Sequence, residues 1–330
     1  MADTSVGIDP GLEAAFEAHR RELTGYCYRM LGAGSEAEDA VQETLLRAWK
    51  AFDRFEGRSS IRSWLYRIAT NVCVDMHRTP QRRARPMDLG PSSTVATAVL
   101  RAQAENTFVL PVADGRVIDT QGDPAELAAG RESIRLAFVA ALQHLPARQR
   151  AVLILCEVLK WQATEVAELL ETTVPSVNSA LQRARATLSS LDVDQLDSTV
   201  DPEHEELLAR YVDAFERYDM TALAQLLRDD VVISMPPHDL WLEGPDNLIG
   251  WMAGPGHGCA GSRLVRVEAN GTAAFGQYKS AGPGRWEPWG LQVIEVRDGK
   301  ISGHHNFLED FSGVRLGLFE EFGLPAFLED

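Results

Sequence analysis

The chain has 330 residues, 45% of them hydrophobic and 24% charged, values that fit a soluble globular protein of two or three domains. Its four cysteines form no C-x-x-C pair, so neither a zinc module nor a disulfide scaffold is expected. Its N-terminus has no signal-peptide core, and no apolar run approaches the ~20 residues of a membrane span. We therefore expect a cytoplasmic protein and not a membrane protein. The net charge of −16 is uneven, because residues 1–190 carry 22 basic and 23 acidic side chains whereas residues 191–330 carry 10 and 25.

This charge distribution bears on DNA binding. A free-standing DNA-binding domain normally has a basic surplus, because neutralisation of phosphates supplies much of its affinity. Residues 1–190 have a net charge of only −1. This part of the chain therefore either binds DNA together with a partner or does not bind it.

An amphipathic helix is predicted over residues 37–52, AEDAVQETLLRAWKAF. Ser35 and Glu38 form a capping-box pattern at its start. Its apolar residues recur on one stripe, and its outer face is acidic and polar with a tryptophan nearby. The helix is therefore expected to pack on one side and to present the other.

A polar loop, EGRSS, leads to a second predicted helix over residues 61–78, IRSWLYRIATNVCVDMHR. Its inner face is apolar, and six residues face outward: Arg62, Ser63, Tyr66, Arg67, Thr70 and Asn71. This mixture suits single-stranded nucleic acid, whose bases stack on rings and guanidinium planes. A solvated face with Tyr66 half buried is the alternative interpretation.

Residues 80–130 are rich in Pro, Gly and Ala and are predicted to form a flexible, mostly irregular linker. The linker begins with several arginines, which suit either a DNA backbone or plain solvation. Within it, residues 109–111, VLP, are the candidate for an ordered docking point.

Residues 148–188 are predicted to form three helices, the last two joined by a tight turn at residues 171–174. Pro175 suits the first turn of the last helix. The outward face of that helix carries side chains that read base edges or hold phosphates: Ser176, Asn178, Ser179, Gln182, Arg183 and Arg185. The pattern favours a helix-turn-helix, and an ordinary three-helix bundle is the alternative.

After an acidic linker, residues 203–330 begin with helices and continue with alternating strands, including a hairpin signal at Asp298-Gly299. This order resembles the SnoaL-like or nuclear-transport-factor-2-like cone, which encloses a pocket. The residues proposed to line that pocket are Tyr211, Phe215, Trp241, Trp251, Trp289 and His305. His304 or His305 with Asp310, and His238 with Asp239, are the candidate acid–base pairs, but lone histidines on strands are mostly structural, and we expect no catalytic residue.

The helical motifs, taken in this order, resemble an extracytoplasmic-function sigma factor of the sigma-70 family. The resemblance implies two all-α domains followed by an α+β cone. The expected boundaries are 10–79 for sigma domain 2, 80–130 for the linker, 131–190 for sigma domain 4, 191–202 for the acidic linker and 203–330 for the SnoaL-like domain.

The resemblance also implies roles for individual residues. Domain 2 would bind the β′ clamp helices of core RNA polymerase through Asp39, Gln42, Glu43, Leu46 and Trp49. It would melt and hold the −10 promoter element through Ser59, Ser60, Arg62, Trp64, Tyr66, Arg67 and Asn71. The outward face of the last helix of domain 4 would read the −35 element, and domain 4 would contact the β flap.

Three functions remain open at this stage. In the first, the chain is a sigma factor that needs no cofactor or metal, and its acidic C-terminal domain, with or without a small-molecule ligand, modulates its activity in cis. In the second, it is a one-component regulator that senses a ligand and binds duplex DNA alone. In the third, it is a SnoaL-like enzyme fused to a DNA-binding module.

Overall fold

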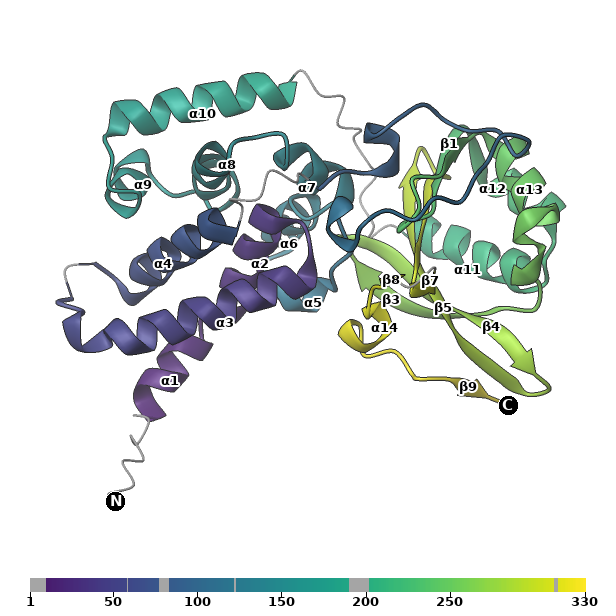
Figure 1. Cartoon of the computed structure of the whole chain (residues 1–330), viewed down its shortest axis with the longest axis horizontal. Coiled ribbons are helices and arrows are strands. Elements are labelled where there is room, and N and C mark those ends of the chain that lie inside the picture. The colour runs from purple at the N-terminus through teal and green to yellow at the C-terminus, as the bar shows by residue number, and fades with distance from the viewer. Residues whose placement is uncertain (1–9, 58, 77–82, 122, 190–201, 312–313) are drawn as a thin grey trace.

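The computed structural model describes residues 10–57, 59–76, 83–121, 123–189, 202–311 and 314–330. Two helical domains lie side by side, and a sheet domain packs against them (Figure 1). None of the helices in these segments is long and apolar enough to cross a bilayer.

The first helical domain packs its helices around tyrosines and small apolar residues. Its elements are α1 (Pro10–Glu17), α2 (Arg20–Leu31), α3 (Gly34–Ala51), the 3₁₀ turn η1 (Phe52–Arg54) and α4 (Ile61–Met76). The predicted helix at residues 37–52 is confirmed, but the capping box is wrong: α3 already begins at Gly34, and Ala33 precedes it without a side-chain cap.

The segment predicted as a flexible linker is irregular but packed in its described part. Its short elements are η2 (Pro86–Asp88), η3 (Glu105–Thr107), α5 (Asp114–Val117) and α6 (Pro124–Glu132). Residues 108–112 are buried, and the Leu110 amide donates to the Gly32 carbonyl at 2.9 Å. The Tyr28 hydroxyl donates to the Leu110 carbonyl at 2.9 Å. The candidate docking point at residues 109–111 is thus ordered against α2.

The second helical domain contains the predicted tight turn between two helices. Its elements are α7 (Leu136–Leu142), α8 (Ala147–Leu153), the π-helical turn η4 (Ile154–Val158), α9 (Ala163–Leu169) and α10 (Val174–Ser189). Glu171 adopts a φ of 49° between α9 and α10, a left-handed conformation that ends the first helix. The helix-turn-helix geometry is confirmed, with Val177 and Ala184 on the buried side of α10.

The C-terminal domain is a curved sheet with most of its helices on the concave face, whereas its last helix lies on the opposite face, in the core shared with the helical domains. Its helical elements are α11 (Pro202–Glu216), α12 (Met220–Leu226), α13 (Pro245–Ala253), η5 (Pro255–Cys259) and α14 (Leu318–Glu321). Its strands are β1 (Leu227–Ser234), β2 (Trp241–Glu243), β3 (Arg263–Ala269), β4 (Thr272–Gly282), β5 (Arg285–Arg297), β6 (Lys300–Leu308), β7 (Asp310–Phe311), β8 (Val314–Arg315) and β9 (Leu328–Glu329).

The main sheet has the order β2-β1-β6-β5-β4-β3, and β9 also pairs with β5. Strands β1 and β6 pair in parallel, and the other strand pairs are antiparallel. The predicted hairpin at Asp298-Gly299 is confirmed, since β5 and β6 pair on either side of these two residues, which both have positive φ.

Both faces of this sheet are covered. Side chains along a strand alternate between the two faces, so neighbouring residues pack into different cores. Ile294 and Val296 belong to the interior of the C-terminal domain, beneath α11 and α13. Leu291 and Val293 instead join the continuous core that also contains Tyr28, the linker and the second helical domain. The three domains and the linker therefore share one packed core.

Candidate functional site

The outward face of α3 presents an apolar patch in polar surroundings. Leu46 and Trp49 are 44% and 40% exposed, and Asp39 and Gln42 are exposed beside the half-buried Glu43. Large exposed apolar side chains grouped on one surface are typical of a protein-binding site. All five residues predicted to contact polymerase are thus accessible to a partner.

The N-terminal end of α3 is less free. Glu38 forms an ion pair with Arg116 of the linker, and Arg116 lies 3.5 Å from Glu321 of α14. Burial raises the pKa of Glu321 to about 7, with Glu38 and Glu309 adding to the effect and Arg116 opposing it. The C-terminal domain therefore contacts the helix that carries the predicted polymerase surface.

On α4, the expectation that Tyr66 faces outward is wrong. Its side chain has no exposed surface, and its ring centroid lies 5.1 Å from that of Tyr26 and 5.0 Å from that of Trp161. Trp161 precedes α9 in the second helical domain. Thr70, also predicted to be exposed, is buried and bonds to the Tyr26 hydroxyl at 2.8 Å. The second domain covers the aromatic side chain that was predicted to stack on bases.

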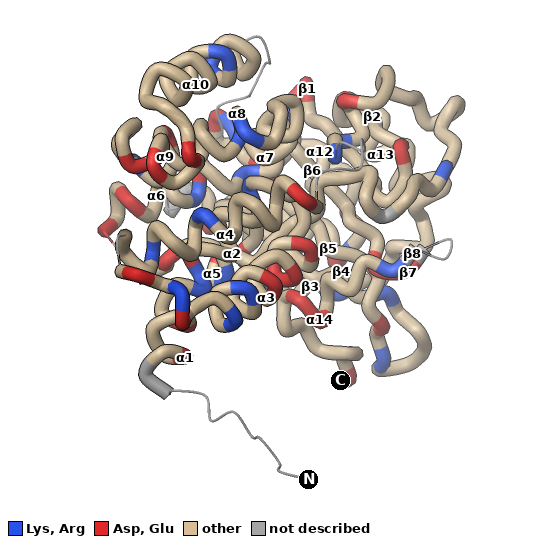
Figure 2. The backbone as a smooth tube through the Cα atoms, turned by 60° about the vertical axis from the view of Figure 1, so that its left-hand side comes forward, with Lys and Arg blue, Asp and Glu red and all other residues tan. Residues whose placement is uncertain are grey.

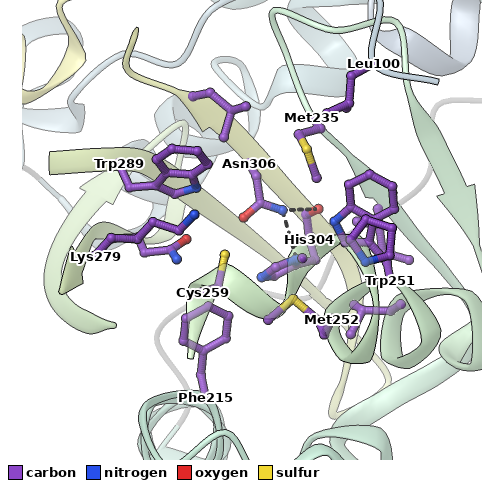
Figure 3. A pocket seen from close by; sticks show the side chains of 16 residues that line it. Leu100, Phe215, Met235, Trp251, Met252, Cys259, Lys279, Trp289, His304 and Asn306 are labelled. Atoms are coloured by element: carbon purple, nitrogen blue, oxygen red, sulfur yellow. Dashed lines mark hydrogen bonds between the residues drawn. The ribbon is translucent and has the colours of Figure 1, made fainter. Parts of the chain in front are cut away.

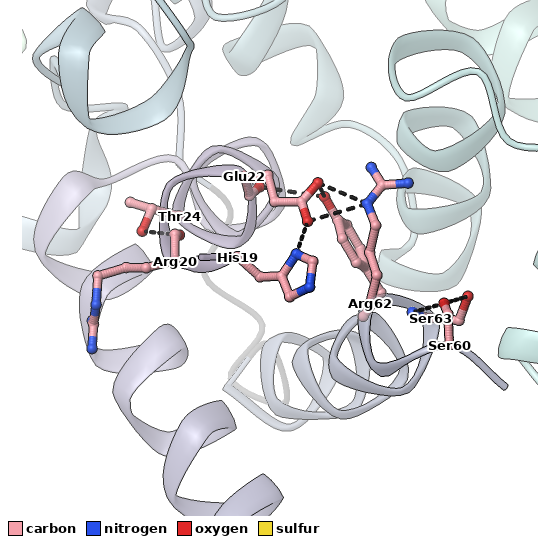
Figure 4. A network of polar contacts seen from close by, with 8 residues as sticks. His19, Arg20, Glu22, Thr24, Ser60, Arg62 and Ser63 are labelled. Atoms are coloured by element: carbon pink, nitrogen blue, oxygen red, sulfur yellow. Dashed lines mark hydrogen bonds and ion pairs between the residues drawn. The ribbon is translucent and has the colours of Figure 1, made fainter. Parts of the chain in front are cut away.

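Arg62 bonds to Glu22 of the first helical domain (Figure 4) and also lies over Trp161 of the second. Its Nε donates to Glu22 Oε2 at 2.8 Å, and its guanidinium lies 5.3 Å from the centre of the Tyr66 ring and 5.0 Å from that of Trp161. Such cation–π contacts stabilise by roughly 0.5–2 kcal/mol. Farther along the helix, Arg67 lies 3.5 Å from Glu171 of the second domain.

The other residues predicted to contact the −10 element differ in accessibility. Asn71 and Ser60 are exposed, and Ser60 Oγ accepts a bond from the Ser63 amide at 3.1 Å at the start of α4. Ser59 is half-buried, and Trp64 is half-buried against Phe55, at a ring-centroid distance of 4.8 Å. In this structure Trp64 therefore packs against Phe55.

The predicted duplex-reading face of α10 is open to solvent. All six of its residues are exposed: Ser176, Asn178, Ser179, Gln182, Arg183 and Arg185. Arg183 donates to Ser179 at 2.9 Å, and Arg185 pairs with Glu157 at the surface. Figure 2 shows basic positions on α10 and acidic positions on neighbouring α9. Exposed ion pairs contribute only about 0–1 kcal/mol, so phosphates can readily compete for these arginines.

The β3–β4 hairpin tip, Asn270-Gly271, forms a contact site that was not predicted from the sequence. Asn270 is 1% exposed; its Nδ2 donates to the Tyr28 hydroxyl and to the Ile134 carbonyl, both at 2.6 Å. Its Oδ1 accepts from the Val112 amide at 3.0 Å, and the Gly271 amide donates to Asp114 at 2.8 Å. One turn thus binds both helical domains and the linker. The Asn-Gly pair is a strong hairpin signal, although it does not reveal where the turn docks.

The C-terminal domain encloses a cavity of about 180 Å³ between its concave sheet face and its helices. Of the residues predicted to line it, Phe215, Trp251 and Trp289 do so (Figure 3). Tyr211 lies behind the wall and bonds to His304 at 2.7 Å. Trp241 is not in the wall, because its indole N–H donates to the Gly90 carbonyl on the outside of the domain.

His305 was assigned to the wrong face of the sheet. It bonds to Ser234 at 2.8 Å and lies 3.4 Å from Glu295, whereas His304 and Asn306 line the cavity. Burial, with a smaller effect from His305, lowers the pKa of His304 to about 3, so His304 is neutral at physiological pH. In the described segments no cluster of three His, Cys, Asp or Glu side chains is suited to hold a metal ion.

Comparison with known proteins identifies the three domains. Residues 15–83 match Sigma-70 region 2, residues 135–188 match Sigma-70 region 4 and residues 208–304 match the SnoaL-like domain. The chain is 42% identical over 314 residues to the ECF RNA polymerase sigma factor SigG of Mycobacterium tuberculosis, covering 94% of this chain and 82% of the relative. The chain belongs to the extracytoplasmic-function sigma factors.

This sigma factor is also 27% identical to SigJ of Mycobacterium tuberculosis over 301 residues, covering 87% of this chain and 88% of the relative. The crystal structure of SigJ superposes with a TM-score of 0.60 at 23% identity, covering 95% of this chain and all of that one. The predicted fold class, two helical sigma domains followed by a SnoaL-like domain, is therefore confirmed.

Proposed function

We propose that this sigma factor binds core RNA polymerase through the exposed face of α3 and directs initiation at specific promoters. In this proposal α10 reads the −35 element in the major groove, and α4 with its preceding loop holds the melted −10 element. Domain 4 also contacts the β flap, and the protein acts in the cytoplasm. The exposed Leu46 and Trp49 and the open polar face of α10 support these assignments.

In this proposal, the observed arrangement of the domains is a closed form that does not hold the −10 element. Tyr66, which would stack on an unpaired base, has no exposed surface while Trp161 lies beside it. The Asn270 turn adds a bridge from the SnoaL-like domain to the direct contacts between the two helical domains, because it bonds to Tyr28 of the first and to the Ile134 carbonyl ahead of α7 in the second. This single observation carries the proposal that the SnoaL-like domain is an inhibitor in cis, without a catalytic role.

The proposal is tested by replacing Asn270 with glycine. Asn270 has a φ of 54°, which glycine adopts without strain, so N270G removes the side chain and keeps the turn. Three hydrogen bonds are lost at about 0.5–1.5 kcal/mol each, so the closed-to-open ratio should fall by roughly tenfold or more. Run-off transcription with core polymerase should therefore rise at limiting sigma factor.

The control is D298G, which alters the other hairpin tip, where the φ is 53° and Asp298 is exposed. D298G should transcribe as the parent chain does. An N270G variant that folds and transcribes no better than D298G would contradict inhibition through this turn. Tight binding of duplex DNA in a gel shift without polymerase would instead favour a one-component regulator.

A further inference from the structure

The cavity of the SnoaL-like domain is small and mostly apolar. Its volume is about 180 Å³, and apolar side chains from the sheet and helices form most of its wall: Phe215, Ile233, Leu248, Trp251, Met252 and Leu308. A dry apolar cavity of ~150 Å³ accommodates benzene. The space therefore fits one aromatic ring with a small substituent.

The charge in the wall is positive although the domain is strongly acidic. Among the lining residues the structure describes, Lys279 is the only charged one, and none is acidic. Its Nζ lies 3.4 Å from the centre of the Trp289 ring, and no carboxylate of the described residues forms an ion pair with it. Most arginines of the same domain have such a partner; Arg266, for example, lies 2.5 Å from Glu205. A half-buried ammonium without a counter-ion favours an anionic group in the cavity.

A directed chain of hydrogen bonds fixes the polar groups of the wall. Tyr211 donates to Gln292 at 2.5 Å, so its oxygen accepts from His304 Nε2 at 2.7 Å. His304 Nδ1 then accepts from Asn306 Nδ2 at 3.0 Å, which turns Asn306 Oδ1 away from the histidine. No hydrogen bond within the described part of the chain uses that oxygen. The wall thus offers one cation and one neutral acceptor.

The linker supplies part of the outer wall. Leu100 lines the cavity and is 40% exposed. The next residues are tied to the domain by backbone bonds: the Asp239 amide donates to the Arg101 carbonyl at 3.2 Å, and the Gln103 amide donates to the Pro237 carbonyl at 2.8 Å. A molecule in the cavity would therefore contact the linker and the SnoaL-like domain together.

We propose that this cavity binds a one-ring aromatic carboxylate, with the ring against Phe215 and Trp251 and the carboxylate paired with Lys279. A ring hydroxyl or N–H group donates to Asn306 Oδ1 in the members of this class that fit best. Because the ligand adds contacts between Leu100 and the domain, it favours the closed form and lowers transcription. This regulatory part rests on the function proposed above.

Binding is measured on the full chain by calorimetry and by the fluorescence of Trp251 and Trp289, with benzoate, 4-hydroxybenzoate and neutral benzamide as probes. Benzoate should bind at least tenfold more tightly than benzamide, and 4-hydroxybenzoate more tightly still. K279M should abolish the preference for the anion, whereas K279R, which keeps the charge and the stacking on Trp289, should retain it. K300M, at an exposed hairpin position, should match the parent chain. Circular dichroism confirms that each variant is folded.

Each of three results would overturn the proposal. The chain could bind benzoate and benzamide with equal affinity, or a folded K279M variant could bind benzoate as the parent chain does. The third result is the absence of saturable benzoate binding at millimolar concentration. Run-off transcription distinguishes binding of the ligand from its proposed effect on transcription. If saturating benzoate lowers the transcript yield several-fold and L100A abolishes this effect, the proposed regulation through the linker is supported. If benzoate binds without any effect on transcription, that regulation is overturned. If N270G activates while benzoate does not bind, the proposed function stands and the ligand assignment fails.

Discussion

His304 and His305, neighbours on β6, face opposite sides of the sheet, and this alternation limits what the sequence reveals about the cavity. The sequence pattern predicts a strand and nearby aromatic residues, but a shift of one residue exchanges the two faces. The side that became the interior depends on where β1 and β5 pair with β6. Tyr66 was likewise expected at the surface, because the helical period places it outward. Contacts with Tyr26 of its own domain and with Trp161 of the other domain bury it.

Gly271 provides a test at the scale of one residue. Its φ is 71°, and a Cβ at this position would lie 2.5 Å from the Arg131 carbonyl oxygen. Gly299, at the other hairpin, has a φ of 68° and nothing within 4 Å of such an atom. Both alanine variants should lose about 1–2 kcal/mol from backbone strain, and G271A should lose more because it separates the docked surfaces. Urea unfolding measures the difference, and equal losses would mean that docking at Gly271 adds no stability.

Among the elements, the helices were easier to predict than their neighbours. Apolar periodicity located α3, α4, α9 and α10 because each helix has a complete stripe of its own. The linker has no such period, so its short turns and its path could not be predicted. Helix α14, four residues long, owes its position to tertiary contacts, including bonds from the Leu318 and Phe319 amides to Glu309.

The packing of α14 on α3 should depend on pH. Burial raises the pKa of Glu321 to about 7 and that of Asp114, at the Asn270 turn, to about 6. Because both values lie above those of the unfolded chain, the protonated carboxyls favour docking at low pH. Their contribution is lost as pH rises, through about 6 for Asp114 and about 7 for Glu321. The midpoint of urea unfolding should therefore fall as pH rises from about 4, where these carboxyls ionise in the unfolded chain, to about 7, and should level off above pH 7.

E321Q should remove the decline between about pH 6 and pH 7, because glutamine stays neutral, and should leave the decline below about pH 6 that Asp114 causes. E320Q, at the exposed neighbouring position, is the matched control and should behave as the parent chain. A parent midpoint that is constant or rises over this range would show that these carboxyls do not oppose docking when charged.

At the scale of the whole molecule, the three domains could be predicted separately, but their common core could not. Each domain has its own period and composition, and the order of the helical motifs indicated the family. The apolar residues on the convex face of the sheet, such as Leu291 and Val293, are equally compatible with a dimer interface or with docking in cis. Only the three-dimensional contacts assign them to the sigma domains.

Removal of residues 202–330 should raise promoter-dependent transcription several-fold. The truncation deletes the Asn270 turn and most of the net negative charge, so domains 2 and 4 can separate and approach DNA without the acidic surface of the C-terminal domain. Run-off yield is compared with that of the full chain over a range of salt concentrations. Identical yields throughout that range would rule out inhibition by the C-terminal domain.

The path of the linker has a thermodynamic consequence. Residues 93–112 hydrogen-bond to β2, to the segment before it and to α2 at the same time. If this segment enters the polymerase when the holoenzyme assembles, its hydrogen bonds to the C-terminal domain and to α2 must first break. The free energy of these linker contacts is then subtracted from the apparent free energy of polymerase binding. The concentration of core enzyme therefore helps to determine how much of the protein is in the open form.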